Sequence, residues 1–309
     1  MHPWYCWGII FLSNINLHIQ DVLIMVQLHL KKFDMTTIPD NNVIVMLGKR
    51  ETGKSVLVRD ILYHHKDIPV GAVISETEIA NKFYGHLVPS KFIHHRADPE
   101  IVTRVLKRQD KMKRIMNHQI NNKGGTNIDS RAFLVLDDCL ASGNKWINHP
   151  SIKFTFFNGR HYNLLVMITL QYPLGISPQL RSNIDYVFVL RDNLTNNRKR
   201  IYENYCGMFP TFEYFCQVMD QTTEDFQCLV IHNNSKSNKI EDQVFWYRAE
   251  MHKPFRLGTE FHWKNFNDCD SDCGDLDCDD DSDVRPRNKG PMVTVVRSPT
   301  SNRNVKERL

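Results

Sequence analysis

The chain has 309 residues, of which 41% are hydrophobic, so it is long and apolar enough to bury a sizeable core as one large domain or two small ones. Its formal net charge of +4 includes the nine Asp of residues 268–283, without which the remaining residues carry +13. A basic body of this kind favours a polyanionic partner such as nucleic acid, although net charge does not determine a fold.

The cysteines argue against a disulfide framework and against a zinc site. They are scattered and include no Cys-x-x-Cys pair, as expected for the reduced thiols of an intracellular protein. The eight are Cys6, Cys139, Cys206, Cys216, Cys228, Cys269, Cys273 and Cys278. The apolar stretch Trp4 to Leu12 is too short to span a bilayer, so we expect no transmembrane segment. Residues 1–24 show no clear periodicity and are expected to be an extension of unknown role.

A phosphate-binding loop is expected near the start of the folded domain. Alternation in residues 26–30 predicts a strand, and a second strand, Val43 to Leu47, leads directly into a glycine-flanked turn and then a helix. This arrangement directs unpaired backbone N–H groups and the positive helix end at one spot, where a polyphosphate binds. The loop consists of Gly48, Lys49, Arg50, Glu51, Thr52, Gly53, Lys54 and Ser55. Lys54 is placed to reach the outer phosphates and the Ser55 hydroxyl to hold Mg²⁺.

Residues 71–75 predict a second buried strand, followed by Glu76 at its carboxyl end. That acid either orients water or nucleotide or, more commonly, caps a helix. Residues 98–119 predict a long amphipathic helix with a basic face. The basic face is either a nucleic-acid contact or a solvated surface.

Residues 133–138 predict a buried strand that ends in two adjacent carboxylates, Asp137 and Asp138. Two adjacent acids are costly to bury unless a cation holds them. With a phosphate loop upstream, Asp137 is assigned to the Mg²⁺ shell and Asp138 to polarisation of the attacking water.

Another apolar strand, residues 164–170, ends in Gln171, whose amide can hydrogen-bond both water and a γ-phosphate as a sensor; otherwise it is a polar strand cap. Arg160 precedes the same strand by a few residues and should therefore face away from the nucleotide of its own chain. That position suits an arginine finger given to a neighbouring subunit, or alternatively a surface salt bridge.

Strands are also expected over residues 186–190, 226–231 and 244–247, and helices over 195–206 and 211–219. The repeated strand and helix patterns predict an α/β fold with a parallel sheet covered by helices on both faces. From about residue 264 the chain becomes acidic and then polar, and we expect this tail to be disordered. The expected domains are an extension over 1–24, an ATPase domain over 25–263 and a tail over 264–309.

The combined motifs resemble the FtsK/HerA superfamily of P-loop motor ATPases, and most closely the genome-packaging ATPases of the nucleocytoplasmic large DNA viruses. The resemblance covers about residues 26–263 and lies in four segments, 48–55, 133–138, 158–173 and 180–188. It implies a RecA/FtsK-like fold, ATP hydrolysis with Mg²⁺, a homo-oligomeric ring and translocation of double-stranded DNA. One departure is Asp138, where the superfamily commonly has Glu.

The resemblance therefore implies a motor that packages viral DNA. Its expected partners are double-stranded DNA and a capsid or portal-vertex protein, and its expected location is the host cytoplasm at the site of virus assembly, or the virion. The alternatives are a P-loop DNA helicase or another DNA-dependent ATPase, a nucleotide kinase, and a nucleotide-dependent scaffold with negligible hydrolysis. A GTPase is disfavoured because no Asn-Lys-x-Asp motif is present.

Overall fold

The computed structural model describes residues 28–139 and 144–267. In this part of the chain, the strands form one nine-stranded sheet in the order β1-β9-β8-β7-β2-β6-β5-β3-β4. The strands are β1 (Lys31–Lys32), β2 (Val43–Leu47), β3 (Gly71–Ser75), β4 (Ile93–His94), β5 (Ala132–Asp137), β6 (Leu164–Leu170), β7 (Tyr186–Val189), β8 (Gln227–His232) and β9 (Val244–Arg248).

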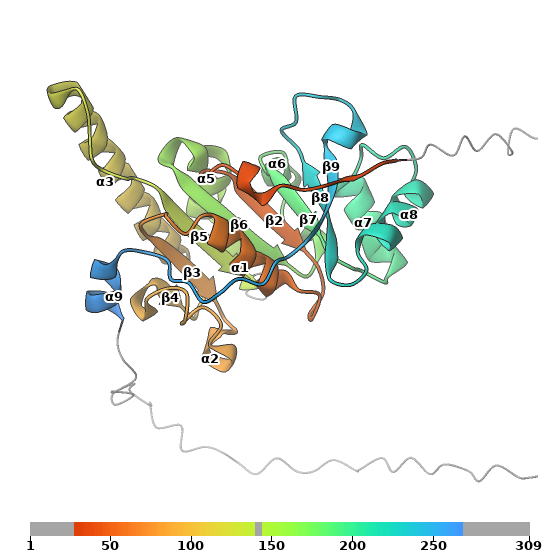
Figure 1. Ribbon diagram of the computed structural model, residues 1–309, viewed down its shortest axis with the longest axis horizontal. Helices are drawn as coiled ribbons and strands as arrows, with labels where there is room; N and C mark the ends of the chain where they lie inside the picture. Colours follow the sequence, from red (N-terminus) through yellow and green to blue (C-terminus); the bar gives the residue numbers. More distant parts are fainter. Residues whose placement is uncertain (1–27, 140–143, 268–309) are drawn as a thin grey trace, which may run out of the picture. The chain divides into compact units, whose positions relative to one another are not determined.

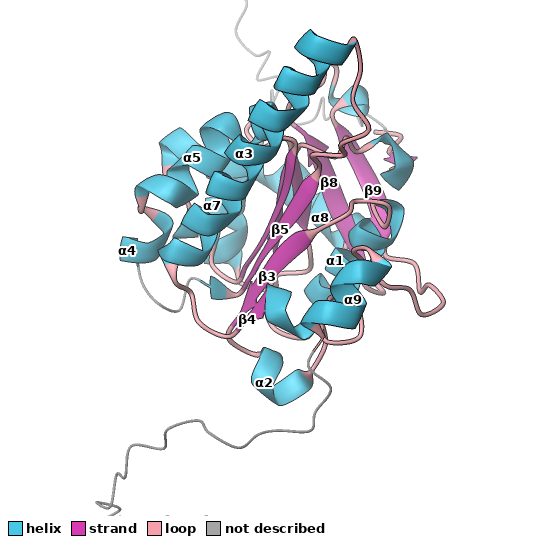
Figure 2. Ribbon diagram, turned by 90° about the vertical axis from the view of Figure 1, so that its left-hand side faces the viewer, coloured by secondary structure: helices cyan, strands magenta, loops and turns pink. Residues whose placement is uncertain are grey.

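Helices cover both faces of the sheet (Figures 1 and 2). The helices are α1 (Lys54–His64), α2 (Glu78–Asn81), α3 (Pro99–Lys123), α4 (Asn144–Ile147), α5 (Pro150–Asn158), α6 (Pro178–Arg181), α7 (Thr195–Tyr205), α8 (Phe212–Thr222) and α9 (Glu260–Phe266). The α/β fold with helices on both faces is thereby confirmed.

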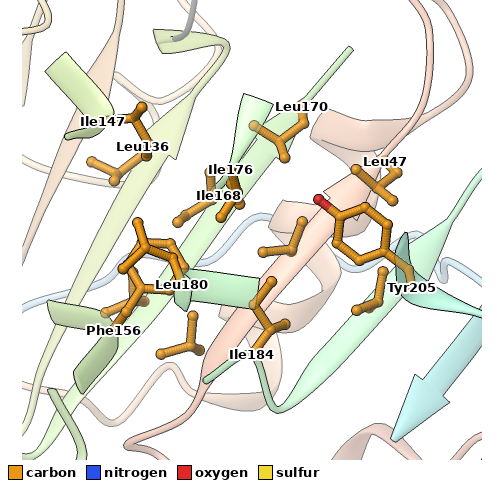
Figure 3. Packing of buried hydrophobic residues seen from close by; sticks show 14 of the residues in the cluster. Leu47, Leu136, Ile147, Phe156, Ile168, Leu170, Ile176, Leu180, Ile184 and Tyr205 are labelled. Atoms are coloured by element: carbon orange, nitrogen blue, oxygen red, sulfur yellow. The ribbon is translucent and has the colours of Figure 1, made fainter. Parts of the chain in front are cut away.

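Each face of the sheet has its own hydrophobic core, because successive side chains of a strand point to opposite faces. In β2, Val43, Val45 and Leu47 pack in the core beneath α3 to α8, part of which is seen in Figure 3, whereas Ile44 and Met46 pack beneath α1. Since β2 is buried on both faces, it is a continuous apolar run rather than an alternating one.

The strand order determines where the site lies. Strand β6 is inserted between β2, which leads into the phosphate loop, and β5, which ends in Asp137. Strands β2, β3, β5, β6 and β7 are parallel, so their carboxyl ends meet at one edge of the sheet. In open parallel sheets, ligands bind at this edge.

The sheet is parallel only in part, which differs from the expectation. Strand β8 runs antiparallel to both β7 and β9. Residues 233–243 join β8 to β9 and contain only a single 3₁₀ turn, Ile240–Asp242. A loop of this length suffices for an antiparallel neighbour, whereas a parallel neighbour needs a crossover, usually a helix.

Most expected boundaries shift by one to three residues, and two expected elements differ more. Residues 28–30 are not a strand, although Leu28 and Leu30 pack against the core and His29 is exposed, because pairing with β9 begins only at Lys31. The expected helix over 98–119 is confirmed as α3 and ends later, at Gly124, which has a φ of 70°.

Within residues 28–139 and 144–267, none of the helices combines the length and the apolar character that crossing a bilayer requires. The four cysteines in these residues, Cys139, Cys206, Cys216 and Cys228, are all unpaired thiols. Residues 1–24 and the acidic tail lie outside the described residues, apart from 264–267, so the expected domain boundaries stay a prediction.

Candidate nucleotide site

The loop between β2 and α1 holds a partly buried ammonium group. Gly53, at the N-cap of α1, has a φ of 100°, a backbone conformation that glycine adopts readily. The Nζ atom of Lys54 donates hydrogen bonds to the main-chain oxygens of Gly48 at 2.7 Å and Lys49 at 2.6 Å. Burial lowers the pKa of Lys54, and the negative charges of Asp138 and Asp137 oppose this shift. The structure thus combines a helix N-terminus with a nearby ammonium, as a phosphate-binding loop requires.

The start of this loop is fixed by its surroundings. A Cβ atom on Gly48 would lie 2.7 Å from Oγ1 of Thr52 and 2.9 Å from Cβ of Leu190, so a larger residue does not fit without displacement. The Thr52 hydroxyl donates to the carbonyl oxygen of Lys49 at 2.8 Å. The Nζ atom of Lys49 lies 3.1 Å from Oδ1 of Asp192, which follows β7. These contacts hold the loop against the end of β7.

Asp137 is buried at the carboxyl end of β5, opposite Ser75 in the neighbouring strand β3. Its Oδ1 accepts a hydrogen bond from Oγ1 of Thr169 at 2.7 Å, and its Oδ2 accepts one from Oγ of Ser75 at 3.3 Å. A buried carboxylate is costly unless hydrogen bonds replace its hydration. The two hydroxyls supply this replacement and fix the orientation of the carboxylate.

Asp138 points in a different direction because its backbone is left-handed, with a φ of 54°. Its N–H donates to Oγ1 of Thr169 at 2.9 Å, and its Oδ2 accepts a hydrogen bond from Nε2 of Gln171. Burial raises the pKa of Asp138, whereas the Gln171 hydrogen bond and the Lys54 charge oppose the rise. Thr169 therefore contacts both acids, and Gln171 contacts the second.

These groups share one cavity of about 730 Å³ at the carboxyl edge of the sheet. Lys54, Asp137, Asp138 and Gln171 line one part of it. The remaining lining residues come from the loop and α1 (Arg50, Glu51, Gly53, Ser55, Val56), from around α2 (Thr77, Asn81) and from around β8 and β9 (Phe226, Arg248, Ala249, Met251).

The oxygen ligands on this edge fit a magnesium ion. Mg²⁺ prefers oxygen ligands, usually one or two carboxylates together with substrate phosphates and water. The Ser55 hydroxyl and the Asp137 carboxylate face the same cavity, and the hydrogen bonds of Asp137 come from hydroxyls rather than from a cationic side chain. The residues present therefore agree with the predicted Mg²⁺ assignment, which stays a prediction.

Arg160 does not line this cavity and lies at the other end of β6 from Gln171. It belongs to a 3₁₀ turn, Gly159–Tyr162, before the amino end of β6, whereas Gln171 follows the carboxyl end of that strand. Its guanidinium forms an ion pair with the carboxylate of Asp185, which is 1% exposed, while the Arg160 side chain is 44% exposed. The salt bridge that the sequence left as an alternative is therefore present, and the guanidinium also remains accessible from outside.

Several residues of the site were not predicted. Thr169 was detectable, because it is the single polar residue in an otherwise apolar strand. Phe226 and Met251 were not detectable, since they lie in irregular segments on either side of β8 and β9. Glu76 does not occupy the N-cap of α2, which is Thr77. The buried acid in this region is Glu78, which accepts hydrogen bonds from the backbone N–H groups of Tyr84 and Gly85.

The chain matches several proteins of large DNA viruses. It is 39% identical over 242 residues to the uncharacterized protein L437 of Acanthamoeba polyphaga mimivirus, across 77% of this chain and 84% of that protein. It is 40% identical to the uncharacterized protein 075L of invertebrate iridescent virus 6, across 67% of this chain and 78% of that protein. Protein 015R of frog virus 3 is 35% identical, across 72% of this chain and 66% of that protein.

No protein-family profile matches the chain. Among solved structures, the genome packaging NTPase B204 of Sulfolobus turreted icosahedral virus 2, in complex with sulfate, has a TM-score of 0.46 at 14% identity, across 70% of this chain and all of that one. EssC (ATPases 2 and 3) of Geobacillus thermodenitrificans has a TM-score of 0.46 at 12% identity, across 69% of this chain and 41% of that one. These relatives agree with the viral resemblance stated from the sequence: the chain belongs to a family of proteins of large DNA viruses that includes mimivirus protein L437 and protein 075L of invertebrate iridescent virus 6.

Proposed function

We propose that this protein is an ATP-hydrolysing motor that moves viral double-stranded DNA into the capsid. The observation that carries the proposal is the convergence of Lys54, Asp137, Asp138 and Gln171 on one cavity, although they come from three separate segments of the chain. Phosphoryl transfer to water requires a lysine that binds phosphates, an acid that holds a metal ion, a second acid that activates water and a sensor of the γ-phosphate. These four side chains can supply those functions.

Each side chain has one role in this proposal. Lys54 binds the outer phosphates, and Ser55 and Asp137 hold Mg²⁺, which would neutralise the negative charge of the phosphates. Asp138 accepts a proton from the attacking water, helped by its raised pKa, because a base works best when its pKa lies closer to the operating pH. Gln171, hydrogen-bonded to Asp138, orients that water and senses the γ-phosphate.

Two large apolar residues that line the cavity, Phe226 and Met251, suit the adenine base. Phe226 is 66% exposed and Met251 is 76% exposed, although both are large and apolar. A Cβ atom on Gly53 would lie 3.6 Å from Cδ1 of Phe226, so this ring stands directly beside the phosphate loop. An exposed aromatic ring is a stacking surface for a base.

The remaining features of the proposal concern assembly and DNA. Arg160 would reach the nucleotide of a neighbouring subunit in a homo-oligomeric ring, because it lies at the opposite edge of the sheet from its own cavity. The basic body favours double-stranded DNA. A capsid or portal-vertex protein would anchor the ring, and the work would take place in the host cytoplasm during virus assembly or at the virion.

The test is the rate of ATP hydrolysis by the purified protein at low salt, with and without double-stranded DNA. We expect DNA to stimulate hydrolysis, Lys54→Ala to abolish it, and the exposed control Lys236→Ala to leave it unchanged. Hydrolysis that ignores DNA would contradict the motor. Nucleotide binding without measurable hydrolysis would instead support the scaffold.

A further inference from the structure

A second group of ligand-type side chains lies on α1, away from the phosphate loop. Asp60 and His64 are one helical turn apart and therefore share a face of the helix. His252 approaches them from the segment after β9. The Oδ1 atom of Asp60 lies 2.5 Å from Nε2 of His252 and 3.5 Å from Nε2 of His64. One ligand atom from each residue lies within 4.8 Å of the other two.

The carboxylate of Asp60 is held in a fixed orientation. It is fully buried, and its Oδ2 accepts hydrogen bonds from the Tyr247 hydroxyl at 2.7 Å and from the Glu250 backbone N–H at 2.9 Å. The second oxygen, Oδ1, is therefore the one that faces the two imidazoles. Outer hydrogen bonds that orient a ligand in this way are a regular feature of metal sites.

The imidazole of His252 is also positioned by packing. Its ring stacks on Tyr63 with the centroids 3.7 Å apart and the planes 6° apart. The His64 ring stands edge-on to it, with the centroids 5.6 Å apart. Both Nε2 atoms thereby converge on the same oxygen of Asp60.

We propose that Asp60, His64 and His252 bind a divalent transition metal ion of the zinc class. Two imidazole nitrogens and one carboxylate oxygen are a recurrent zinc ligand set, and ligands about 2.0–2.1 Å from a tetrahedral ion lie about 3.3 Å apart. The separation of His64 and Asp60 already matches that spacing. The separation of His252 and Asp60 has to open by about 0.8 Å, which is a small shift for a residue outside any helix or strand.

Three protein ligands leave the fourth coordination position of a tetrahedral ion for water. A hollow of about 290 Å³ lined by His64, Tyr247 and Glu250 adjoins the group. The Glu250 carboxylate instead forms an ion pair with Nζ of Lys32 at 2.9 Å. The proposed site would therefore combine three protein ligands with a water molecule in the fourth position.

The metal site lies beside the nucleotide cavity, and what this implies for ATP binding rests on the proposed function. The segment from Arg248 to His252 contacts both sites. Arg248, Ala249 and Met251 line the nucleotide cavity, whereas Glu250 and His252 form hydrogen bonds with Asp60. Helix α1 also begins at Lys54. A bound ion would tie this wall of the nucleotide cavity to the helix that carries the phosphate-binding lysine.

The experiment measures metal binding by the full chain, purified without a histidine tag, stripped with a chelator and dialysed against Zn²⁺ or Co²⁺. We expect one ion per chain by elemental analysis and a visible Co²⁺ spectrum of tetrahedral type. His64→Ala and His252→Ala should lose the ion, and Tyr247→Phe should weaken its binding about 10–100-fold. His262→Ala, on α9, is the matched control that should bind normally.

A wild-type protein that retains no ion above the chelated blank would overturn the proposal, as would full binding by both histidine variants. Circular dichroism identifies variants that do not fold. If the variants fail to fold, the metal content of the wild-type protein alone still tests the proposal. Because metal content does not depend on ATP turnover, failure of this site and failure of the proposed motor are distinguishable.

Discussion

The hydroxyl of Thr169 forms hydrogen bonds with both acids of the site. Replacing Thr169 with valine, which puts a methyl group in place of the hydroxyl, tests this geometry with little change in side-chain shape. Thr169→Val keeps a branched side chain near the carboxyl end of β6 but removes two hydrogen bonds. One is donated to Asp137 at 2.7 Å, and the other is accepted from the N–H of Asp138 at 2.9 Å.

The expected loss of stability follows from these two bonds. A hydrogen bond to a charged group contributes about 1.5–3 kcal/mol, and a buried donor left without a partner costs about 1–3 kcal/mol. Since the half-buried Asp138 lies beside the cavity, where water can reach its N–H, we expect a total of about 3 kcal/mol. For a domain of this size that corresponds to a decrease in Tm of about 6–12 °C.

The variant should also slow hydrolysis. Without the Thr169 hydroxyl each acid loses one of the contacts that orient it. Displacement of a catalytic group by about 1 Å can reduce a rate about 100-fold. The assay is a thermal unfolding curve followed by steady-state ATP turnover at a temperature where both proteins are folded.

Thr155→Val is the matched control, because Thr155 is equally buried and its hydroxyl donates only to the carbonyl oxygen of Ile152 in its own helix at 2.7 Å. It should cost only about 0.5–1.5 kcal/mol and leave kcat unchanged. If Thr169→Val melts with the control and turns over ATP like the wild type, the bridging role of Thr169 is wrong.

Three further predictions concern the same site. Asp138→Asn should slow hydrolysis at least about 100-fold without destabilising the fold at neutral pH, and an unchanged rate would remove Asp138 from the mechanism. Burial raises the pKa of Asp138 above its ordinary 3.8, so its ionised form costs stability as the pH rises through that window. For the same reason, wild-type turnover should fall on acidification with a midpoint above 3.8. Phe226→Ala should weaken ATP binding about tenfold, the lower part of what base stacking contributes, while leaving inorganic phosphate binding unchanged, both measured by calorimetry; equal losses for both ligands would refute base stacking. Arg160→Ala should lower hydrolysis without abolishing ATP binding, and mixing this variant with Lys54→Ala should restore activity. A mixture without activity would contradict an arginine finger shared between subunits. A variant that does not fold would show that the ion pair with Asp185 is the main role of Arg160.

The central strands and the positions of the loop and acid residues that line the cavity were predictable because their signals are local. Strand β2 is an unbroken apolar run followed by a glycine-flanked loop, and β5 is an apolar run ending in two acids, so each can be recognised within about ten residues. The order of these segments along the chain, together with the rule that parallel strands collect ligands at their carboxyl edge, was sufficient to bring Lys54, Asp137 and Gln171 together.

The other parts of the site depend on contacts between distant segments. Phe226 reaches the phosphate loop only because β8 turns back antiparallel to β7, and no local pattern predicts that direction. Asp60 and His252 are separated by 192 positions, and each by itself resembles an ordinary polar residue. The left-handed backbone of Asp138 is likewise invisible in the sequence, because aspartate and asparagine adopt it in many unrelated turns.

The central claim, that the protein moves along double-stranded DNA, is tested most directly by displacement of a third strand from a DNA triplex. The account predicts that the wild type with ATP and Mg²⁺ releases the third strand, that Lys54→Ala does not, and that the underlying duplex stays paired. Separation of the duplex strands would identify a helicase instead. A protein that hydrolyses ATP on this DNA but leaves the triplex intact would contradict the account.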